Sequence, residues 1–540
     1  MFKSVSEWIE RILSVNHLKN KSAFITEAGL EITYQELLDK SSNVANALKG
    51  AGIKSGDHVA VWIPNSIDWV TLEIGCGMIG ATLVALNTRY RSHELSYILK
   101  QSDSKILFFT RDSNGHTNDE VLKDIMPELF TTEKVSKFSQ FPMLRMAVCT
   151  SNSSPYGAWP MQDFIEQFKI HDELNLQSKK TDILNILYTS GSTSRPNGAM
   201  LSHQTVLGHS SNIFHHMKIN QADTSLELLP FCGIFGLNSL WVSLLGGATI
   251  VAPETFQVER VCQLIREHRC TVLNAVDEMH SIIIQYKNKA SVDLSSLRIG
   301  ATGIFIHDSM GIMSQMEQNI NYRMLHTYGM SEIGSMLLLK KPEDPLSTRV
   351  IPGGKPVSGK VKIIDPNTLM EVPDKETGEI AVSGINVMSG YYNAPEKNKE
   401  AFLEDHYFRT GDIGIKYQDG TIEYRGRLRE ALRLSGFLVS PSEIEGFLNE
   451  IDGIELSQVV GLEHNQKTTI VSFIKLERSS SLTIEDIHSH CQRLAHFKRP
   501  KHFFIVDDFP KTQGPNGEKI IRKRLVEMAQ SMVIQQINNI

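Results

Sequence analysis

The chain has 540 residues, of which 41% are hydrophobic and 21% are charged, and its formal net charge is −6. This composition is typical of a soluble globular protein with more than one domain, and it lacks the basic surplus that would point to nucleic acid or an anionic membrane as a partner. The six cysteines are scattered without a Cys-x-x-Cys pair, which argues against a disulfide framework or a zinc site and favours a reducing, cytoplasmic location.

The N-terminal stretch and the longest apolar stretch bear on membrane association. Residues 1–20 mix apolar residues with Glu7, Glu10 and Arg11, which predicts an amphipathic surface helix and not a signal peptide. The stretch 237–252 is interrupted by Asn238 and a Gly-Gly pair and is too short to span a bilayer. The sequence therefore predicts no transmembrane segment.

Strand-like and helix-like stretches alternate from residue 32 onwards. Short apolar runs at 58–63, 82–86 and 105–109 indicate strands, and residues 67–79 and 93–100 have the pattern of helices. This alternation predicts an α/β fold, with parallel sheets wrapped by helices on both faces.

The alternation pauses and then resumes. Residues 111–181 are weakly patterned, and we expect surface connections there around one or two short strands. Further strands are expected at 226–229, 248–251, 271–275, 297–301 and 322–327, with a helix at 258–267.

The last third of the chain changes in texture. From residue 351, short strands are punctuated by Gly and Pro, with an Asp419-Gly420 hairpin signal. We expect a large N-terminal domain over 1–427, whose β-rich subdomain spans about 351–427. A small C-terminal α+β domain is expected over 428–540.

The stretch Tyr188–Gly198 has the composition of an anion-binding loop. It contains four hydroxyl side chains within five residues, at Ser190, Ser192, Thr193 and Ser194, between two apolar runs that predict strands. Glycine and small hydroxyl residues let backbone N–H groups approach a polyphosphate closely. The Gly-x4-Gly-Lys spacing of a Walker loop is absent, and a plain solvated turn is the alternative.

This stretch resembles the signature loop of the adenylate-forming superfamily, which includes acyl-CoA synthetases, nonribosomal adenylation domains and beetle luciferases. Two positions depart from the usual form, because Ser194 replaces glycine and Asn197 replaces lysine. The resemblance implies an ATP site that includes Thr189, Ser190, Gly191, Ser192, Thr193 and Gly198, with Thr193 also near a magnesium ion.

A second motif, His326 to Glu332, follows a predicted strand, and open α/β sheets bind ligands at such strand ends. An aromatic ring, a hydroxyl and a carboxylate suit a nucleobase, a phosphate oxygen and Mg²⁺. This stretch resembles the family's Tyr-Gly-x-Thr-Glu motif. The resemblance implies that Tyr328 stacks on adenine and that Glu332 binds Mg²⁺ as a catalytic residue. Other nucleotide contacts would come from Gly329, Ser331, Thr302 and Gly303.

Two further motifs follow along the chain in the same order as in the superfamily. Thr410-Gly411-Asp412 resembles the motif whose aspartate accepts hydrogen bonds from both ribose hydroxyls, a task that suits a carboxylate. Gly426 to Arg429 resembles the motif that ends the large domain. It implies that Arg427 contacts ribose or phosphate and that Arg429 is the hinge of a mobile small domain.

The predicted small domain contains two more such motifs. The stretch 434–445 resembles the loop and helix start that line the pantetheine tunnel of acyl-CoA ligases, with Ser442 a candidate N-cap. It implies coenzyme A contacts from Arg433, Ser435 and Gly436. The stretch 510–525 resembles the family's catalytic-lysine motif, with extra residues before the lysine, and it implies that Lys519 is catalytic.

The expected acyl pocket lies in two stretches, and its residues are Phe231, Cys232, Gly233, Gly300 and Ala301. Gly233 stands where the family often carries histidine. The wall is small and apolar and has no Asp or Glu for an amino group, so we expect an uncharged acyl or aryl tail. Phe231 and Phe235 could instead be ordinary core residues.

Together these resemblances imply an ATP-dependent acid–thiol ligase. It would convert a carboxylic acid, fatty or otherwise apolar, into an acyl adenylate and transfer it to coenzyme A, using Mg²⁺. One alternative acceptor is an acyl-carrier protein, although the sequence contains no fused carrier domain. A catalytically quiet nucleotide- or acyl-binding homologue is the other alternative, motivated by Ser194, Asn197 and Arg429. The oligomeric state stays open.

Overall fold

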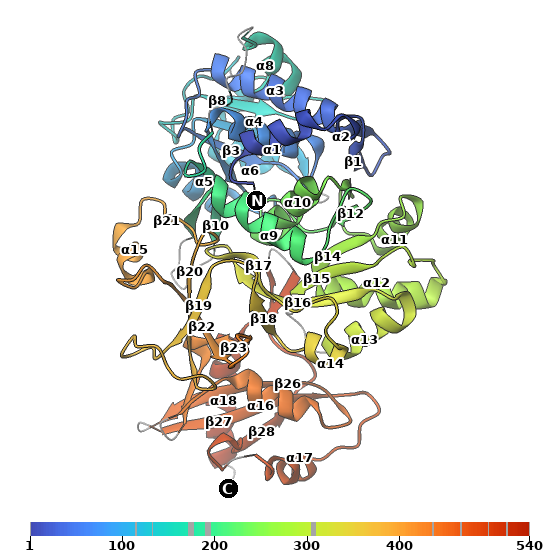
Figure 1. Cartoon of the computed structure of the whole chain (residues 1–540). Coiled ribbons are helices and arrows are strands. Elements are labelled where there is room, and N and C mark those ends of the chain that lie inside the picture. Colours follow the sequence, from blue (N-terminus) through green and yellow to red (C-terminus); the bar gives the residue numbers. More distant parts are fainter. Residues whose placement is uncertain are drawn as a thin grey trace. The chain divides into compact units, whose positions relative to one another are not determined.

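This computed structural model describes residues 2–113, 116–131, 133–170, 176, 178–189, 196–303, 309–434, 437–464, 467–494, 496–514 and 517–538 (Figure 1). The chain divides into two compact units. The first holds most of the chain up to Lys360 together with Ser383–Phe402, and the second holds Val361–Val382 and Leu403–Ile540. The predicted boundary between 427 and 428 therefore falls inside the second unit.

An eight-stranded sheet forms one half of the first unit, in the order β21-β11-β10-β4-β3-β5-β8-β9. Its central strands are parallel, as predicted. The strands are β3 (His58–Trp62), β4 (Thr82–Ala85), β5 (Ile106–Phe109), β8 (Met146–Cys149), β9 (Trp159–Pro160), β10 (Ile183–Thr189), β11 (Asn197–Ser202) and β21 (Gly390–Tyr391). The short hairpin β6 (Asp112–Ser113) and β7 (His116–Thr117) stands apart from it.

Helices accompany this sheet. They are α3 (Tyr34–Gly50), α4 (Ile67–Ile79), α5 (Ser92–Gln101), α6 (Asp119–Ile125), α7 (Glu128–Thr131), α8 (Met161–Gln167) and α15 (Pro395–Ala401). Helix α3 begins where it does because Thr33 and Glu36 form a reciprocal capping box. Helix α4 ends at Gly80, which adopts the left-handed conformation that glycine tolerates.

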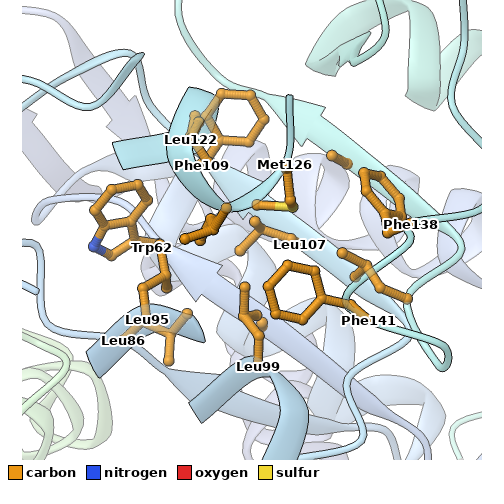
Figure 2. Packing of buried hydrophobic residues seen from close by; sticks show 14 of the residues in the cluster. Trp62, Leu86, Leu95, Leu99, Leu107, Phe109, Leu122, Met126, Phe138 and Phe141 are labelled. Atoms are coloured by element: carbon orange, nitrogen blue, oxygen red, sulfur yellow. The ribbon is translucent and has the colours of Figure 1, made fainter. Parts of the chain in front are cut away.

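The prediction of mere surface connections for 111–181 is wrong in part. Figure 2 shows Leu122, Met126, Phe138 and Phe141 packed against Leu107 of β5 in one buried cluster. These side chains lie on short helices and irregular turns, where burial leaves no periodic pattern in the sequence. The region therefore completes the core beside the sheet.

A second sheet in the first unit has the order β18-β17-β16-β15-β14-β12-β13-β1-β2. The strands from β16 to β1 run parallel, so their carboxyl ends meet at one edge. The strands are β1 (Ser22–Thr26), β2 (Glu31–Thr33), β12 (Thr224–Glu227), β13 (Thr249–Ala252), β14 (Val272–Val276), β15 (Ile299–Gly303), β16 (Arg323–Met330), β17 (Gly334–Leu339) and β18 (Gly353–Pro356).

The remaining helices of this unit include the predicted N-terminal one. They are α1 (Val5–Ser14), α2 (Asn16–Lys19), α9 (His209–His216), α10 (Ile234–Gly246), α11 (Val258–Glu267), α12 (Asp277–Ala290), α13 (Ser309–Ile320) and α14 (Leu346–Arg349), with a short π-helix at Gln204–Gly208. Helix α1 is amphipathic, as predicted, and buries Trp8, Ile9 and Ile12. Within the described ranges, no helix is long and apolar enough to cross a membrane.

The second unit contains several small sheets. Its strands are β19 (Lys360–Ile364), β20 (Thr377–Ser383), β22 (Phe408–Lys416), β23 (Ile422–Arg427), β24 (Leu432–Leu434), β25 (Phe437–Val439), β26 (Ile454–His464), β27 (Lys467–Leu476), β28 (His502–Ile505), β29 (Lys511–Gly514) and β30 (Gly517–Ile520). The helices are α16 (Pro441–Asn449), α17 (Ile484–Cys491) and α18 (Arg522–Asn538), with 3-10 turns at Leu428–Glu430 and His496–Lys498.

Two predictions for this unit meet the structure directly. The hairpin at Asp419-Gly420 is confirmed, because β22 and β23 pair antiparallel on either side of it. The prediction that Ser442 caps helix α16 is wrong. Ser440 is the N-cap, because Pro441 occupies the first helical position and the Ser440 hydroxyl accepts from the Ser442 N–H.

Candidate active site

The predicted phosphate loop is carried by the hairpin of β10 and β11. Thr189 pairs with Asn197 at the end of this hairpin where the predicted loop connects the two strands, as the sequence predicts. Gly198 is required there, because a Cβ atom would lie 2.7 Å from a methyl carbon of Ile186. Ser190, Gly191, Ser192 and Thr193, and with them Ser194, lie outside the described residues, so their predicted phosphate contacts stay predictions.

Glu332 lies beside Thr189, the last residue of β10. Its side chain is buried, and its Oε1 atom accepts hydrogen bonds from the Thr189 hydroxyl at 3.2 Å and the Tyr391 hydroxyl at 2.9 Å. Its Oε2 atom has no hydrogen bond to any residue that the structure describes. One carboxylate oxygen is therefore held by two hydroxyl groups, and the Lys397 ammonium interacts electrostatically with the same carboxylate.

Two residues of this cluster were missed by the sequence reasoning. Burial and the neighbouring Glu332 carboxylate raise the pKa of Tyr391, so its phenol stays a hydrogen-bond donor. The Lys397 ammonium lies 4.5 Å from the centre of the Tyr391 ring, and burial lowers the pKa of that lysine. Gly390-Tyr391 follows the signature loop by almost two hundred residues, and no local pattern links the two stretches.

These residues suit Mg²⁺ as it is used with nucleotides. Magnesium is bound by one or two carboxylates, waters and substrate phosphates more often than by an all-protein cage. The described part of the chain contains no group of three His, Cys, Asp or Glu side chains that could hold a metal ion by itself. Glu332 with one open oxygen fits this mode of binding.

The backbone around Tyr328 is irregular. The pairing of β16 with β17 shifts register between Tyr328 and Met330, and Gly329 cannot be replaced without a clash, because a Cβ atom would meet the Gly334 carbonyl at 2.4 Å. Met336 opposite has a φ of 55°, which is strained for a residue with a side chain. The irregularity sets Tyr328 and Glu332 in their places at the end of β16.

Strand β15 presents the predicted residues on two different faces. A Cβ atom at Gly300 would meet the Leu273 carbonyl at 1.8 Å and the Tyr322 hydroxyl at 2.0 Å, so packing against Tyr322 requires glycine there. Ala301 points to the other face, because side chains alternate along a strand. Ala301 is fully buried in a hydrophobic cluster with residues of α9 and α10. The predicted places of Gly300 and Ala301 in an acyl-pocket wall stay predictions.

Thr302 shares its face with His326 of the neighbouring strand. Burial and the nearby Lys340 together lower the pKa of the His326 ring to about 3, so this histidine is neutral. The Thr302 hydroxyl and both His326 ring nitrogens have no hydrogen-bond partner among the described residues. Buried polar atoms of this kind, next to Gly303, fit a site that a polar ligand completes.

The other expected wall is the turn before α10. Asn65 fixes this turn, because its amide donates to the Leu229 carbonyl and accepts from the Phe231 N–H, both at 2.8 Å. Phe231 is buried against Trp69, with ring centres 5.3 Å apart. Cys232 and Gly233 are partly exposed. Phe231 thus anchors the turn, while Cys232 and Gly233 remain accessible.

Asp412 and Arg427 lie together in the second unit. They are paired across β22 and β23, and their side chains form an ion pair at 2.8 Å in which the Asp412 carboxylate is only 3% exposed. Gly411 has a φ of 67°, which allows the turn into this position. The two residues predicted to contact the ribose therefore form one charged group.

The predicted hinge residue, Arg429, lies on the 3-10 turn Leu428–Glu430 with its side chain 66% exposed. Its neighbour Glu430 binds Arg522 at 3.2 Å, and Arg522 also binds Glu445 at 2.8 Å. The sequence reasoning missed this cluster. It ties the turn to the start of α18 and to α16.

Several predicted residues are described only in part. Lys519 lies on β30 opposite Thr512, and Arg433 lies on β24 opposite Leu438, but neither side chain is among the described ones. Ser435 and Gly436 lie outside the described residues. Their predicted roles with ATP and coenzyme A stay predictions.

Comparison with known proteins decides the family. The model of the AMP-binding enzyme family matches residues 13–392, and the model of the AMP-binding enzyme C-terminal domain matches residues 443–514. The chain belongs to the AMP-binding enzyme family.

Individual relatives of this AMP-binding enzyme are acyl-CoA ligases. It is 27% identical to the 3-[(3aS,4S,7aS)-7a-methyl-1,5-dioxo-octahydro-1H-inden-4-yl]propanoyl:CoA ligase of Rhodococcus jostii, over 93% of this chain and 95% of the relative. It is 25% identical to the mitochondrial medium-chain acyl-CoA ligase ACSF2 of Rattus norvegicus, over 97% and 88%. The solved ATP-bound RpMatB-BxBclM chimera is 25% identical, with a TM-score of 0.81 over 98% of this chain and 100% of that chain.

These matches agree with the predicted superfamily and the predicted α/β fold with a large and a small domain. The chain is thus an enzyme of the AMP-forming acyl-CoA ligase family. The acids named for the two relatives differ in shape and polarity, and this enzyme's own acid is addressed next.

Proposed function

We propose that this enzyme activates a carboxylic acid with ATP and transfers the acyl group to coenzyme A. A carboxylate oxygen attacks the α-phosphorus, the bond to the β-phosphate oxygen breaks, and pyrophosphate leaves. The thiolate of coenzyme A then attacks the acyl carbon of the acyl adenylate, and AMP leaves with the oxygen that came from the acid.

The main support for this proposal is the environment of Glu332. The Glu332 carboxylate is buried beside the predicted phosphate loop, with Oε1 held by Thr189 and Tyr391 and Oε2 open. A bound Mg²⁺ would supply positive charge near the phosphates. Glu332 would hold this ion in place, and Thr189 and Tyr391 would keep the carboxylate from turning away.

The other residues take roles that follow from their chemistry. Tyr328 would stack on the adenine, and the Asp412 carboxylate, oriented by Arg427, would accept hydrogen bonds from the ribose. Lys519 would donate to the α-phosphate oxygens, where charge develops in the transition state. The signature loop would hold the outgoing pyrophosphate with N–H and hydroxyl donors, and Asn197 would add an amide in place of a charged lysine.

The acid is proposed to have an uncharged tail. The accessible Cys232 and Gly233 would present no charged side chain to it. The names of the relatives support a broad range, since one acts on a medium-chain acid and another on a cyclic dioxo acid. A fatty acid is therefore one member of the class that we propose.

The test is release of pyrophosphate across a panel of carboxylic acids, followed by competition between coenzyme A and a holo acyl-carrier protein. We expect turnover that needs both ATP and an acid, and thioester formed on coenzyme A. Acyl transfer to the carrier protein alone would replace the proposed acceptor. No turnover with any acid would contradict the proposal and favour a quiet homologue.

A further inference from the structure

A hollow lies between the N-terminal helices α1 and α2 and the C-terminal ends of α9 and α10, and these helices are neighbours in Figure 1. Its volume is about 510 Å³, within the range of about 300–1,000 Å³ that is typical of small-molecule sites. Its lining is mostly apolar, with Ile12, Phe214 and Leu245 among the side chains that form it. The hollow therefore has the size and the surface to hold an apolar tail.

Contacts between these elements give the hollow its shape before any ligand binds. The Trp8 indole donates a hydrogen bond to the Leu244 carbonyl at 3.2 Å, which fixes α1 against α10. Gly247 ends α10 in the left-handed conformation, and a Cβ atom there would lie 3.2 Å from a methyl carbon of Leu18. Because the walls already pack against one another, a ligand loses little free energy to ordering them.

The hollow is separate from the candidate active site. Helix α10 begins directly after Gly233, in the turn expected to form an acyl-pocket wall, and only the end of the helix, from Leu245, lines the hollow. Its 13 residues span about 20 Å at about 1.5 Å per residue. A ligand in the hollow would therefore not be the acid held in that acyl pocket.

Three basic side chains line the hollow, and they are Arg11, His17 and His215. The described residues that line it include neither Asp nor Glu, although the whole chain has a net charge of −6. The Arg11 side chain is exposed, and its guanidinium forms no ion pair or hydrogen bond with any residue that the structure describes. His215 donates from Nδ1 to the Ser211 carbonyl at 2.6 Å, which leaves its Nε2 atom available to a ligand. This charge complements an anionic group.

The backbone at the hollow offers a ligand less than these side chains do. A helix C-terminus carries a partial negative charge and open carbonyls, which would favour a cation. The Leu244 carbonyl in the last turn of α10, however, already accepts from the Trp8 indole. The Ile12 carbonyl in the last turn of α1 accepts from the Val15 N–H at 3.2 Å. The basic side chains are therefore the polar groups that a ligand meets.

We infer that this hollow is a second ligand site, which binds a free carboxylic acid with its carboxylate at Arg11 and its apolar tail against Ile12, Phe214 and Leu245. Such a site goes beyond the proposed function, because binding here needs neither ATP nor transfer of an acyl group. The ligand belongs to the same chemical class as the proposed substrate. A test must therefore locate the bound acid as well as detect it.

Photo-cross-linking of the full chain locates the acid. Dodecanoic acid with a diazirine in its tail is irradiated with the protein in the absence of ATP, and the labelled peptides are identified by mass spectrometry. We expect label within 2–18 and 214–221, which line the hollow. Dodecanoate should displace the probe, and dodecanol should do so about three- to fivefold less well, because an exposed ion pair adds a modest free energy. Label confined to other stretches, or equal displacement by acid and alcohol, would overturn the inference.

The length of the tail tests the apolar part of the hollow. Across competitors from octanoate to tetradecanoate, each added methylene should improve displacement about two- to fourfold until the hollow is full. No gain with length would overturn the inference, and so would displacement by anionic phospholipid vesicles but not by the monomeric acids. The assay contains no ATP, so its outcome is independent of turnover and of the proposed function.

Variants assign the preference for a carboxylate to one residue. Arg11→Gln removes the charge from an exposed position, so the advantage of dodecanoate over dodecanol should vanish, whereas Arg11→Lys should keep it. Arg266→Gln is the matched control, because Arg266 is also exposed in the last turn of its helix, α11, and does not line the hollow. It should behave as the wild type does. Thermal unfolding confirms that each variant is folded, and an advantage of dodecanoate that survives in folded Arg11→Gln would overturn the inference.

Discussion

Removing the Tyr391 hydroxyl tests the role given to Glu332. Tyr391→Phe deletes the 2.9 Å bond to Oε1 and leaves only the 3.2 Å bond from Thr189. A hydrogen bond to a charged group contributes about 1.5–3 kcal/mol, and about 1.4 kcal/mol corresponds to a factor of ten. Because Thr189 still holds the carboxylate, we expect the lower end of this range. The Mg²⁺ concentration for half-maximal activity should rise about tenfold, as for other groups that orient a metal ligand.

The assay is pyrophosphate release at saturating ATP and acid, titrated with Mg²⁺. Tyr392→Phe is the matched control, since the neighbouring Tyr392 hydroxyl donates to Asp103 at 2.9 Å and not to Glu332. It should leave the Mg²⁺ dependence unchanged. If Tyr391→Phe and Tyr392→Phe gave the same titration curve, the reasoning about Glu332 would be refuted.

The remaining predictions concern other groups. Lys519→Ala should slow adenylation roughly 10²–10³-fold, since one charged donor to the transition state is lost, yet it should form thioester normally from a supplied acyl adenylate; normal adenylation would rule the assignment out. Asp412→Ala should raise the KM for ATP about tenfold, because the ribose loses a charged acceptor, and equal use of ATP and 2′-deoxy-ATP by the wild type would show that the ribose role is wrong. Asn197→Lys should lower the KM for ATP by a few-fold and leave acyl preference unchanged, which a higher or equal KM would contradict. Burial raises the pKa of Glu73 from 4.5 to about 7. Its contribution to the free energy of unfolding is therefore present below pH 4.5 and lost as the pH rises through 7. Chemical denaturation should show Glu73→Gln gaining stability relative to wild type over that interval, and a constant difference would contradict the reasoning.

Most helices and strands could be predicted because the apolar pattern of each is local. Residues 67–79 and 258–267, predicted as helices, match α4 and α11 residue for residue. The failure at 111–181 has the opposite cause. Phe138 and Phe141 are buried through irregular turns, and only contacts with the distant strand β5 and helix α5 show that they belong to the core.

The residues of the candidate site also divide into those with a local sequence signal and those without one. Glu332 and Asp412 could be singled out because each stands in a short motif whose chemistry can be read from neighbouring residues. Tyr391 could not, since its role depends on a partner far away in the sequence, Glu332. The alternation of Gly300 and Ala301 across two faces was open to sequence reasoning, because strand periodicity alone separates neighbours.

The most direct test of the central claim follows the oxygen of the acid. An accepted acid, labelled with heavy oxygen in its carboxyl group, is converted with ATP and coenzyme A, and the products are examined by mass spectrometry. Attack of the carboxylate on the α-phosphorus predicts one labelled oxygen in AMP and none in pyrophosphate. Unlabelled AMP, or label in inorganic phosphate alongside ADP, would contradict activation through an acyl adenylate.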